Sequence, residues 1–168
     1  MRICVLTVKH DDSSAGYTRL SKFGSIGPIT EKISRIIREN FTNVPDPEIG
    51  IPSTIIYYLD DNDNIASILY TTSIMFELPE SVIDTNIPCT YVYYVCTAEK
   101  YRGQGLCKNL FKTLFKICKI GGVRRVLIDV AKTNNVAQNI YKKLGFKWVG
   151  SIRENLILHD VLSLELDS

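Results

Sequence analysis

Residues 90–118 constrain the fold of this chain more than any other part of its sequence. Residues 90–97, TYVYYVCT, are rich in Tyr and Val, which is typical of a strand. A basic stretch with two glycines, Gly103 and Gly105, follows, and apolar residues then recur with the spacing of a helix. A strand, a glycine turn and a helix N-terminus in this order predict an anion-binding turn. The first N–H groups of a helix have no partner within the helix, and glycine lets a ligand approach the backbone closely.

The other periodic segments predict a mixed α+β fold. The predicted strands are residues 3–8, 54–59, 65–74, 90–97, 123–130, 146–149 and 155–166. The predicted helices are residues 29–41, 106–118 and 136–144. The run DDNDN at residues 60–64 predicts a hairpin turn. Residues 11–28 are predicted as a loop or short helix, and residues 44–52 and 75–88 as connections.

The composition narrows the class of protein. A length of 168 residues and 45% hydrophobic residues fit one globular domain, residues 1–168. The net charge of +2 is too small to indicate nucleic acid or a membrane surface as a partner. No apolar run reaches the roughly 18–20 residues of a membrane span, and the first residues lack the pattern of a secretory signal. We therefore expect a cytoplasmic protein, with a nuclear one as the alternative.

The cysteines and histidines do not indicate a metal site. The two histidines, His10 and His159, have no second ligand at helical or turn spacing. The five cysteines form no CxxC pair and lie among apolar residues, so reduced thiols are expected. They are Cys4, Cys89, Cys96, Cys107 and Cys118. We expect no metal cofactor.

The glycine turn does not match the common nucleotide-binding fingerprints. The chain contains no GxxxxGK(S/T), and the GxG at residues 103–105 lacks the third glycine and the following strand with its acidic end. Taken alone, the turn is equally compatible with an ordinary tight turn that binds nothing.

Two segments resemble signatures of the GNAT superfamily, the acetyl-CoA-dependent N-acetyltransferases. Residues 102–107, RGQGLC, resemble the signature R/Q-x-x-G-x-G/A, and residues 134–146, NNVAQNIYKKLGF, are similar to the segment N-x-x-A-x-x-x-Y-x-K-x-GF. The resemblance covers residues 91–150 well. It implies a GNAT fold, a twisted mixed sheet with helices on both faces and splayed central strands. It also implies that an acetyl group passes directly from acetyl-CoA to a primary amine.

The resemblance also implies roles for individual residues. The CoA pyrophosphate would lie on the backbone of the signature turn, with the Arg102 side chain reaching the phosphates. The pyrophosphate-binding residues would be Arg102, Gly103, Gln104, Gly105, Leu106, Cys107 and Lys108. The pantetheine arm would contact Val95, Cys96, Thr97 and Asn134. Tyr141 would be the general acid that protonates the departing thiolate, as a phenol can.

The base that removes the amine proton is not evident from the pattern. Histone-type members carry a Glu on the strand before the signature, but residues 90–97 contain no acid and Tyr91 lies near that position. Glu77, Glu80 or Asp84 could supply a base, directly or through water.

Several alternatives stay open at this point. Cys107 stands where Gly or Ala is usual, and a thiol at a helix N-terminus can act as a nucleophile. By spacing alone Tyr141 fits a core aromatic better than a catalytic residue. Lys100, Lys108 and Lys112 fit either phosphate contacts or a solvated helix face. The missing strand carboxylate leaves a non-catalytic acyl-CoA-binding module as the second function. The sequence does not distinguish a small amine, a polyamine, a peptide N-terminus or a protein lysine as acceptor, and it gives no oligomeric state.

Overall fold

The computed structural model describes residues 1–8, 27–40, 53–72, 86–154 and 156–167. In these residues the chain forms three α-helices, one short 3-10 helix and a seven-stranded sheet. The elements in chain order are β1 (Arg2–Val8), α1 (Gly27–Asn40), β2 (Ser53–Leu59), β3 (Ile65–Thr72), β4 (Cys89–Thr97), η1 (Glu99–Tyr101), α2 (Leu106–Ile120), β5 (Arg125–Ala131), α3 (Asn135–Leu144), β6 (Lys147–Glu154) and β7 (Ile157–Glu165).

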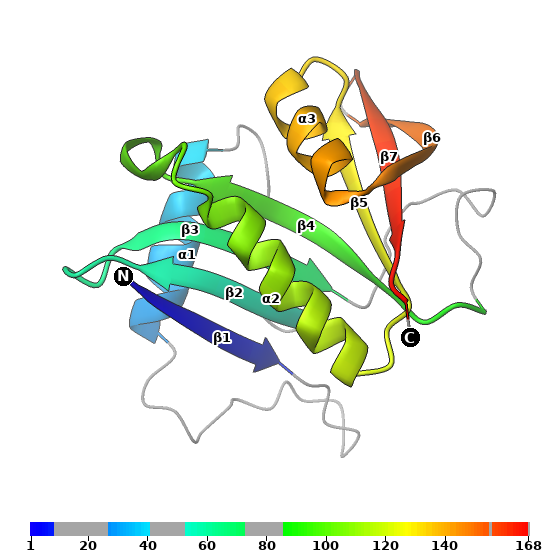
Figure 1. Cartoon of the computed structure of the whole chain (residues 1–168). Coiled ribbons are helices and arrows are strands. Elements are labelled where there is room, and N and C mark those ends of the chain that lie inside the picture. Colours follow the sequence, from blue (N-terminus) through cyan, green and yellow to red (C-terminus); the bar gives the residue numbers. More distant parts are fainter. Residues whose placement is uncertain (9–26, 41–52, 73–85, 155, 168) are drawn as a thin grey trace, which may run out of the picture.

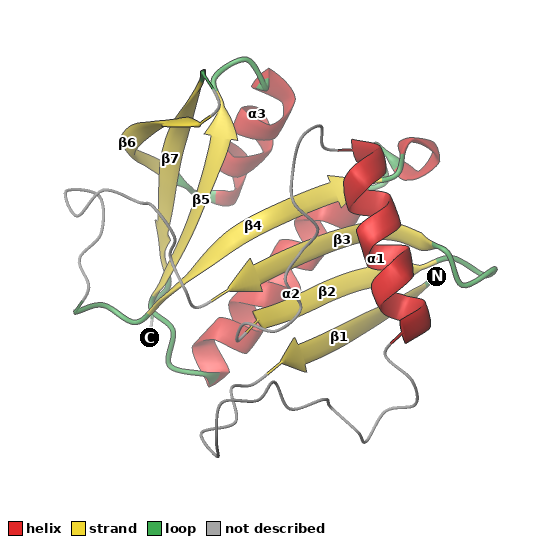
Figure 2. Ribbon diagram, turned by 180° about the vertical axis from the view of Figure 1, so that it is seen from behind, coloured by secondary structure: helices red, strands yellow, loops and turns green. Residues whose placement is uncertain are grey.

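The sheet is mixed, and its strands lie in the order β1-β2-β3-β4-β5-β7-β6. Every neighbouring pair is antiparallel except β4 and β5, which are parallel. Helix α2, the crossover between these two strands, lies with α3 on one face of the sheet, while α1 covers the other face (Figure 1). The view from behind shows α1 in front of β2 and β3, with α2 and α3 behind the sheet (Figure 2). The α+β architecture with helices on both faces is the one the sequence predicts.

Two apolar clusters hold the helices to the sheet, because each helix buries one apolar stripe. The cluster beneath α2 and α3 consists of Ile56, Leu69, Val92, Leu110, Phe111, Leu114, Cys118, Val126, Ile128, Val130, Tyr141 and Phe146. The cluster beneath α1 consists of Ile33, Ile36, Ile37, Ile55, Leu59, Ile65, Ile68, Tyr70 and Tyr94. Because successive side chains of a strand point to opposite faces of the sheet, a buried side chain of β4 or β5 lies either on the α2 and α3 face or on the α1 face.

The predicted boundaries are wrong at the last hairpin. The sequence predicts a strand over residues 146–149 and a second one from residue 155, but β6 continues to Glu154. The register between β6 and β7 shifts between Trp148 and Gly150, so the extra residue is accommodated as a β-bulge. The sequence pattern predicts a strand end before Gly150. The bulge lets the pairing with β7 continue through Gly150 instead.

The β2–β3 hairpin turn is organised by one carboxylate. Asp60 Oδ1 accepts hydrogen bonds from the backbone N–H groups of Asn62 and Asn64, each at 2.9 Å. Its second oxygen, Oδ2, accepts from the Tyr101 hydroxyl at 2.6 Å. The predicted turn at residues 60–64 is confirmed, and its carboxylate also anchors η1 to the hairpin.

Three further facts concern the thiols, the helices and possible metal ligands. All five cysteines are free, with Cys118 buried and the other four partly buried. Within the part of the chain that the structure describes, no helix is long and apolar enough to cross a bilayer. Among the same residues no group of His, Cys, Asp and Glu side chains is arranged to hold a metal ion.

Candidate active site

The two parallel strands β4 and β5 pair over only four residues and then part. The paired residues run from Cys89 opposite Arg125 to Val92 opposite Ile128. Beyond them the register with β3 shifts between Tyr70 and Thr71, which leaves one extra residue, Tyr93, as a β-bulge on β4. The gap between β4 and β5 widens toward the carboxyl ends of both strands (Figure 1). The splayed central strands expected for the fold are present.

Backbone groups of β4 face this gap. The N–H of Ala98 donates to the carbonyl of Ala66 on β3 at 2.9 Å, which fixes the alternation of the antiparallel ladder. In that alternation the amides of Val95 and Thr97 point away from β3 and into the gap, while the amide of Cys96 points to β3. The predicted pantetheine contact is thereby narrowed on β4 to Val95 and Thr97, and it remains a prediction.

The glycine turn lies at the open end of the gap. Gly103 and Gly105 have φ values of 78° and 76°, in the left-handed region that side chains rarely adopt. A Cβ at either glycine would meet no atom within 4 Å, so open space lies over the turn. Gly105 is the N-cap of α2, and the N–H groups of the three residues after it belong to the first helical turn. These residues are Leu106, Cys107 and Lys108.

The side chains around the turn are partly engaged within the protein. Arg102 is exposed, and its Nε donates to the carbonyl of Thr97 at 3.2 Å, which ties the turn to the end of β4. Gln104 Nε2 donates to the carbonyl of Lys100 at 3.4 Å. The Lys100 ammonium forms an ion pair with Asp60 at 3.5 Å and lies over the ring of Tyr101. Its positive charge is therefore already paired within the protein. Of the lysines considered for phosphate contacts, Lys100 therefore acts in holding the turn in place.

The Cys107 thiol is not activated by its position at the helix N-terminus. It is partly buried, and burial raises the pKa of the Cys107 thiol to about 11. The fraction of thiolate at neutral pH is therefore very small, whereas a cysteine nucleophile reacts as the thiolate. The geometry does not favour a catalytic cysteine.

Tyr141 lies on α3 and is buried in the apolar cluster beneath α2 and α3. Its ring packs edge-on against Phe111, with ring centroids 5.8 Å apart, and also contacts Phe146. Burial raises the pKa of the Tyr141 phenol well above its usual value, and the nearby Cys107 and Asp129 raise the pKa further. The phenol is therefore protonated at every physiological pH. Tyr141 is therefore a buried core aromatic with a protonated hydroxyl, and its role as a general acid remains a prediction.

Asn134 has a structural task of its own. Its Oδ1 accepts a hydrogen bond from the N–H of Ala137 at 3.1 Å, which caps the N-terminus of α3. The cap places Asn134 just beyond the end of β5, at the open end of the gap. The amide nitrogen of its side chain is the atom left for the predicted pantetheine contact.

A polar cluster bridges the strands where they begin to part, and the sequence reasoning missed it. The hydroxyl of Tyr91 on β4 donates to Asp129 Oδ1 on β5. His159 Nδ1 on β7 lies 2.5 Å from Asp129 Oδ2. Asp129 is the first residue of β5 beyond the last pair with β4. We call these residues the Tyr91–Asp129–His159 cluster.

The cluster faces the side of the sheet opposite α2 and α3. Leu127 and Val161, which share its face by strand alternation, pack with Tyr91 in a small separate core. The signal that could have revealed it is the single acid inside the apolar run VLIDV, because an ionisable group there needs partners. The acids considered instead, Glu77, Glu80 and Asp84, lie outside the described residues.

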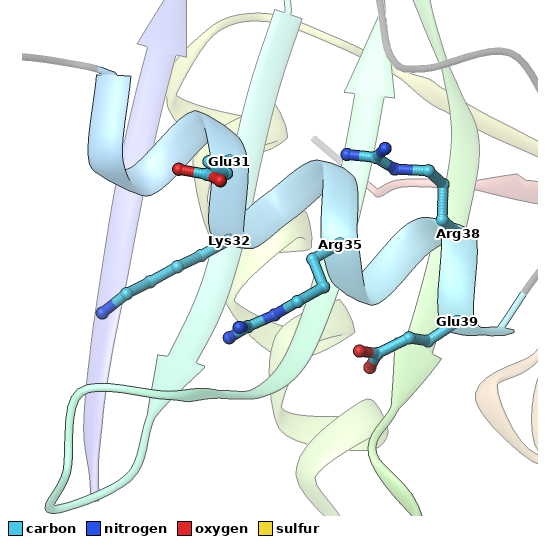
Figure 3. Close-up of a pocket in the computed structure, with 5 residues that line it drawn as sticks. All are labelled: Glu31, Lys32, Arg35, Arg38 and Glu39. Atoms are coloured by element: carbon cyan, nitrogen blue, oxygen red, sulfur yellow. The ribbon is translucent and has the colours of Figure 1, made fainter.

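A separate hollow of about 640 Å³ lies along α1 (Figure 3). Its described lining residues all come from that helix and carry charges of both signs. Lys32, Arg35 and Glu39 extend to one side of the helix (Figure 3). Lys32 Nζ is engaged with the carbonyl of Asp63 at 2.6 Å. None of the predicted site residues lines this hollow, and we assign it no role.

Comparison with known proteins gives a family-level match. The model of the acetyltransferase (GNAT) family matches residues 2–146. The GCN5-related N-acetyltransferase 6, chloroplastic, of Arabidopsis thaliana is 37% identical over 59 residues, which are 35% of this chain and 20% of that protein. A Bacillus subtilis (strain 168) protein provisionally named as a ribosomal protein bS18-alanine N-acetyltransferase is 41% identical over 56 residues, which are 33% of this chain and 36% of that protein. The chain thus spans well under half the length of either relative.

The solved structures agree at the level of the fold. Arabidopsis thaliana NAA60 in complex with acetyl-CoA superposes with a TM-score of 0.69 at 16% sequence identity. The superposition covers 99% of this chain and 100% of that chain. At this identity the likeness concerns the overall arrangement of the elements.

Proposed function

Because the chain belongs to the acetyltransferase (GNAT) family, we propose that it transfers the acetyl group of acetyl-CoA directly to a primary amine. The observation that carries the proposal is the gap between β4 and β5 with the glycine turn at its open end. The turn offers helix N–H groups to the pyrophosphate, and the gap offers the amides of Val95 and Thr97 to the pantetheine arm. Acetyl-CoA is bound in the solved structure of NAA60, which has the same fold.

The arrangement supports direct transfer without an acyl-enzyme. The thioester carbonyl would lie in the gap, where backbone N–H groups can stabilise the developing oxyanion. Tyr141 approaches from the α3 side as the protonated donor for the departing thiolate. The Tyr91–Asp129–His159 cluster lies on the opposite face, where an amine can enter. Since the Cys107 thiol stays protonated, the chemistry needs no cysteine nucleophile.

A carboxylate on a neighbouring strand supports the catalytic interpretation over a non-catalytic module. That alternative depends on the lack of a carboxylate on residues 90–97. Asp129 supplies a carboxylate from the neighbouring strand, in contact with the Tyr91 hydroxyl. This contact supports the proposal that the Tyr91–Asp129–His159 cluster accepts a proton during the reaction.

We propose a peptide N-terminus as the first acceptor class to test. The support is the name of the Bacillus subtilis relative, which specifies a ribosomal protein alanine as its acceptor. The match to that relative covers only 33% of this chain. The set of acceptors to test therefore also includes small amines, polyamines and a lysine peptide.

The test has two steps with purified protein. Calorimetric titration with acetyl-CoA measures binding, and a thiol-release assay with each amine measures transfer. Saturable acetyl-CoA binding together with acetylation of one amine class, verified by product mass, supports the proposal. Acetyl-CoA binding without transfer to any of these amines would favour the non-catalytic alternative. No acetyl-CoA binding at all would overturn the proposed location of the site.

A further inference from the structure

We propose that His159 is the group that takes the proton from the acceptor amine, through its Nε2 atom, and that Asp129 is the positioning residue that fixes its tautomer. The inference rests on the proposed function and identifies the base that the reaction needs. A primary amine is mostly protonated at neutral pH, so it must lose a proton before it can attack a thioester.

The contacts of Asp129 decide which member of the cluster accepts this proton. Its Oδ1 takes the hydrogen bond of Tyr91, and its Oδ2 faces His159 Nδ1 at 2.5 Å. An ionised carboxylate can only accept hydrogen bonds, so Nδ1 of His159 must carry the proton. Nε2 then holds the free electron pair. Each oxygen of Asp129 already has one hydrogen-bond partner, and Nε2 is the basic atom of the cluster without a partner among the described residues.

The location of His159 allows an acceptor to reach it. His159 pairs with Ala131 at the end of β5, on the same face as Asp129. The side chain of His159 is 17% exposed and that of Asp129 is 16% exposed. Because His159 shares a face of the sheet with Asp129, which borders the gap, an amine on that face can reach His159 without crossing the sheet. Tyr141, in contrast, lies on the α3 side.

The groups around His159 come from β4 and from the two strands that flank β7. Asp129 on β5 is its direct partner, and Tyr91 on β4 acts on it through Asp129. On β6 the residue opposite His159 is the apolar Ile152. The nearest pair on the reverse face is Lys132 with Asp160 at 3.4 Å, which is internally neutral. The imidazolium that forms on proton uptake is therefore balanced by Asp129.

The proton and electron balance is complete without a further reactant. The ammonium gives one proton to Nε2 of His159, and the neutral nitrogen forms the new C–N bond with the thioester carbon. The C–S bond then breaks with its electron pair on sulfur, and the sulfur takes a proton from Tyr141. The nitrogen loses its second proton, which replaces the one that Tyr141 gave. The proton on His159 leaves to solvent, so the net products are the amide, the CoA thiol and one proton.

The sharpest variant is His159→Asn. The Asn amide can keep a donor near the position of Nδ1, so the hydrogen bond to Asp129 survives while the basic Nε2 is removed. We expect kcat/KM at pH 7 to fall by about 10²–10⁴-fold, the range for a positioned base. The affinity for acetyl-CoA should stay within twofold, roughly the spread of an unperturbed site. The defect should shrink as the pH rises, because the amine then arrives already deprotonated.

A matched control lies at the next residue. Asp160→Asn removes the charge paired with Lys132 on the reverse face of the same strand and leaves the cluster intact. We expect its kcat/KM and pH profile to follow the wild type. If His159→Asn follows the wild type as well from pH 6 to pH 9, the role of His159 is overturned.

A second readout does not depend on turnover. The chain has only two histidines, so long-range ¹H–¹⁵N spectra of wild type and His159→Asn assign the ring nitrogens of His159. We expect a protonated Nδ1 and a free Nε2 at pH 8, with a mixture of tautomers in Asp129→Asn. A protonated Nε2 in the wild type overturns the inference. A wild type that binds acetyl-CoA and acetylates no amine overturns the proposed function and this inference with it, whereas an active wild type with an equally active His159→Asn overturns only the base.

Discussion

Gly105 and Gly122 flank helix α2 with nearly equal positive φ angles of 76° and 72°. A Cβ at either position would meet no atom within 4 Å. A non-glycine residue would therefore be strained to a similar degree at either position. Only Gly105 lies at the predicted pyrophosphate site. The two glycines form a matched pair for testing where CoA binds.

We expect Gly105→Val to abolish CoA binding. The side chain would occupy the open space over the turn and exclude the phosphates, and the positive φ would cost about 1–3 kcal/mol of stability. Titration calorimetry with CoA and a thermal unfolding curve measure the two effects separately.

Gly122→Val is the control for this variant. It should lose a similar amount of stability while retaining the wild-type affinity for CoA. Equal CoA affinity in the two variants would mean that the pyrophosphate does not lie on the 103–108 turn.

Tyr141→Phe should slow the chemical step with little effect on folding. The Phe ring keeps the contacts with Phe111 and Phe146, and only the buried hydroxyl is lost. We expect kcat to fall by about 10²–10⁴-fold, the range for a positioned proton donor, with CoA affinity nearly unchanged. Single-turnover acetyl transfer is the measurement, and Tyr57→Phe on β2 is the remote control. A wild-type single-turnover rate in Tyr141→Phe would leave water as the proton donor.

Asp60→Asn should loosen the turn and change the acid stability of the fold. The hydrogen bond from the Tyr101 hydroxyl, with those from Asn64 and Asn62, holds the pKa of Asp60 far below its ordinary value of 3.8. A carboxyl group whose pKa is lower in the folded state stabilises the fold at pH values above its ordinary pKa. This stabilisation decreases as the pH falls from the ordinary pKa toward the lowered one. We therefore expect the wild type to be the more stable protein at pH 5–7, and its advantage over Asp60→Asn to shrink steadily as the pH falls from about 4 toward the lowered pKa of Asp60 in the folded protein.

Thermal unfolding from pH 2.5 to pH 7 measures this difference. The same variant should bind CoA roughly 2- to 10-fold more weakly, the equivalent of one ordinary hydrogen bond, because η1 precedes the glycine turn. Asp61→Asn is the control, since the Asp61 side chain is 95% exposed. Parallel pH curves for wild type and Asp60→Asn would contradict the anchoring role.

Cys107→Ala should retain acetyl transfer. Burial raises the pKa of the Cys107 thiol to about 11, so the thiolate that a nucleophile needs is nearly absent at pH 7–8. Incubation of the wild type with acetyl-CoA should leave no acetylated protein in the intact mass spectrum. A stable acetyl adduct that disappears in Cys107→Ala would require a covalent mechanism.

Local patterns were enough to predict most of the fold. Helix α2 follows from its apolar repeat, and its end follows from Gly121 and Gly122. The β2–β3 hairpin follows from the turn residues at 60–64. The strand β6 did not follow, because a bulge at Val149 is a property of the pairing with β7 and leaves no clear mark on one strand.

The site divides in the same way. The glycine turn is local, and the sequence predicts it well. The Tyr91–Asp129–His159 cluster combines residues of three strands, and each contact joins residues that are 30 or more positions apart in the chain. Only the register of the sheet brings them together, so a search for an acid within residues 90–97 could not find Asp129. From the sequence, His159 was considered only as a metal ligand, and no second ligand was found. Its proposed role depends on Asp129, which lies on another strand.

The four-residue contact between β4 and β5 also determines how the backbone exchanges hydrogen with solvent. Tyr94 and Cys96 pair with β3, so their amide hydrogens should be protected in the free protein. The amides of Val95 and Thr97 face the gap and should exchange rapidly. A pantetheine arm that accepts their hydrogen bonds would take the place of a missing strand. The two halves of the sheet would then open as one cooperative unit instead of two, and deuterium uptake at alternate residues of β4 would record that change.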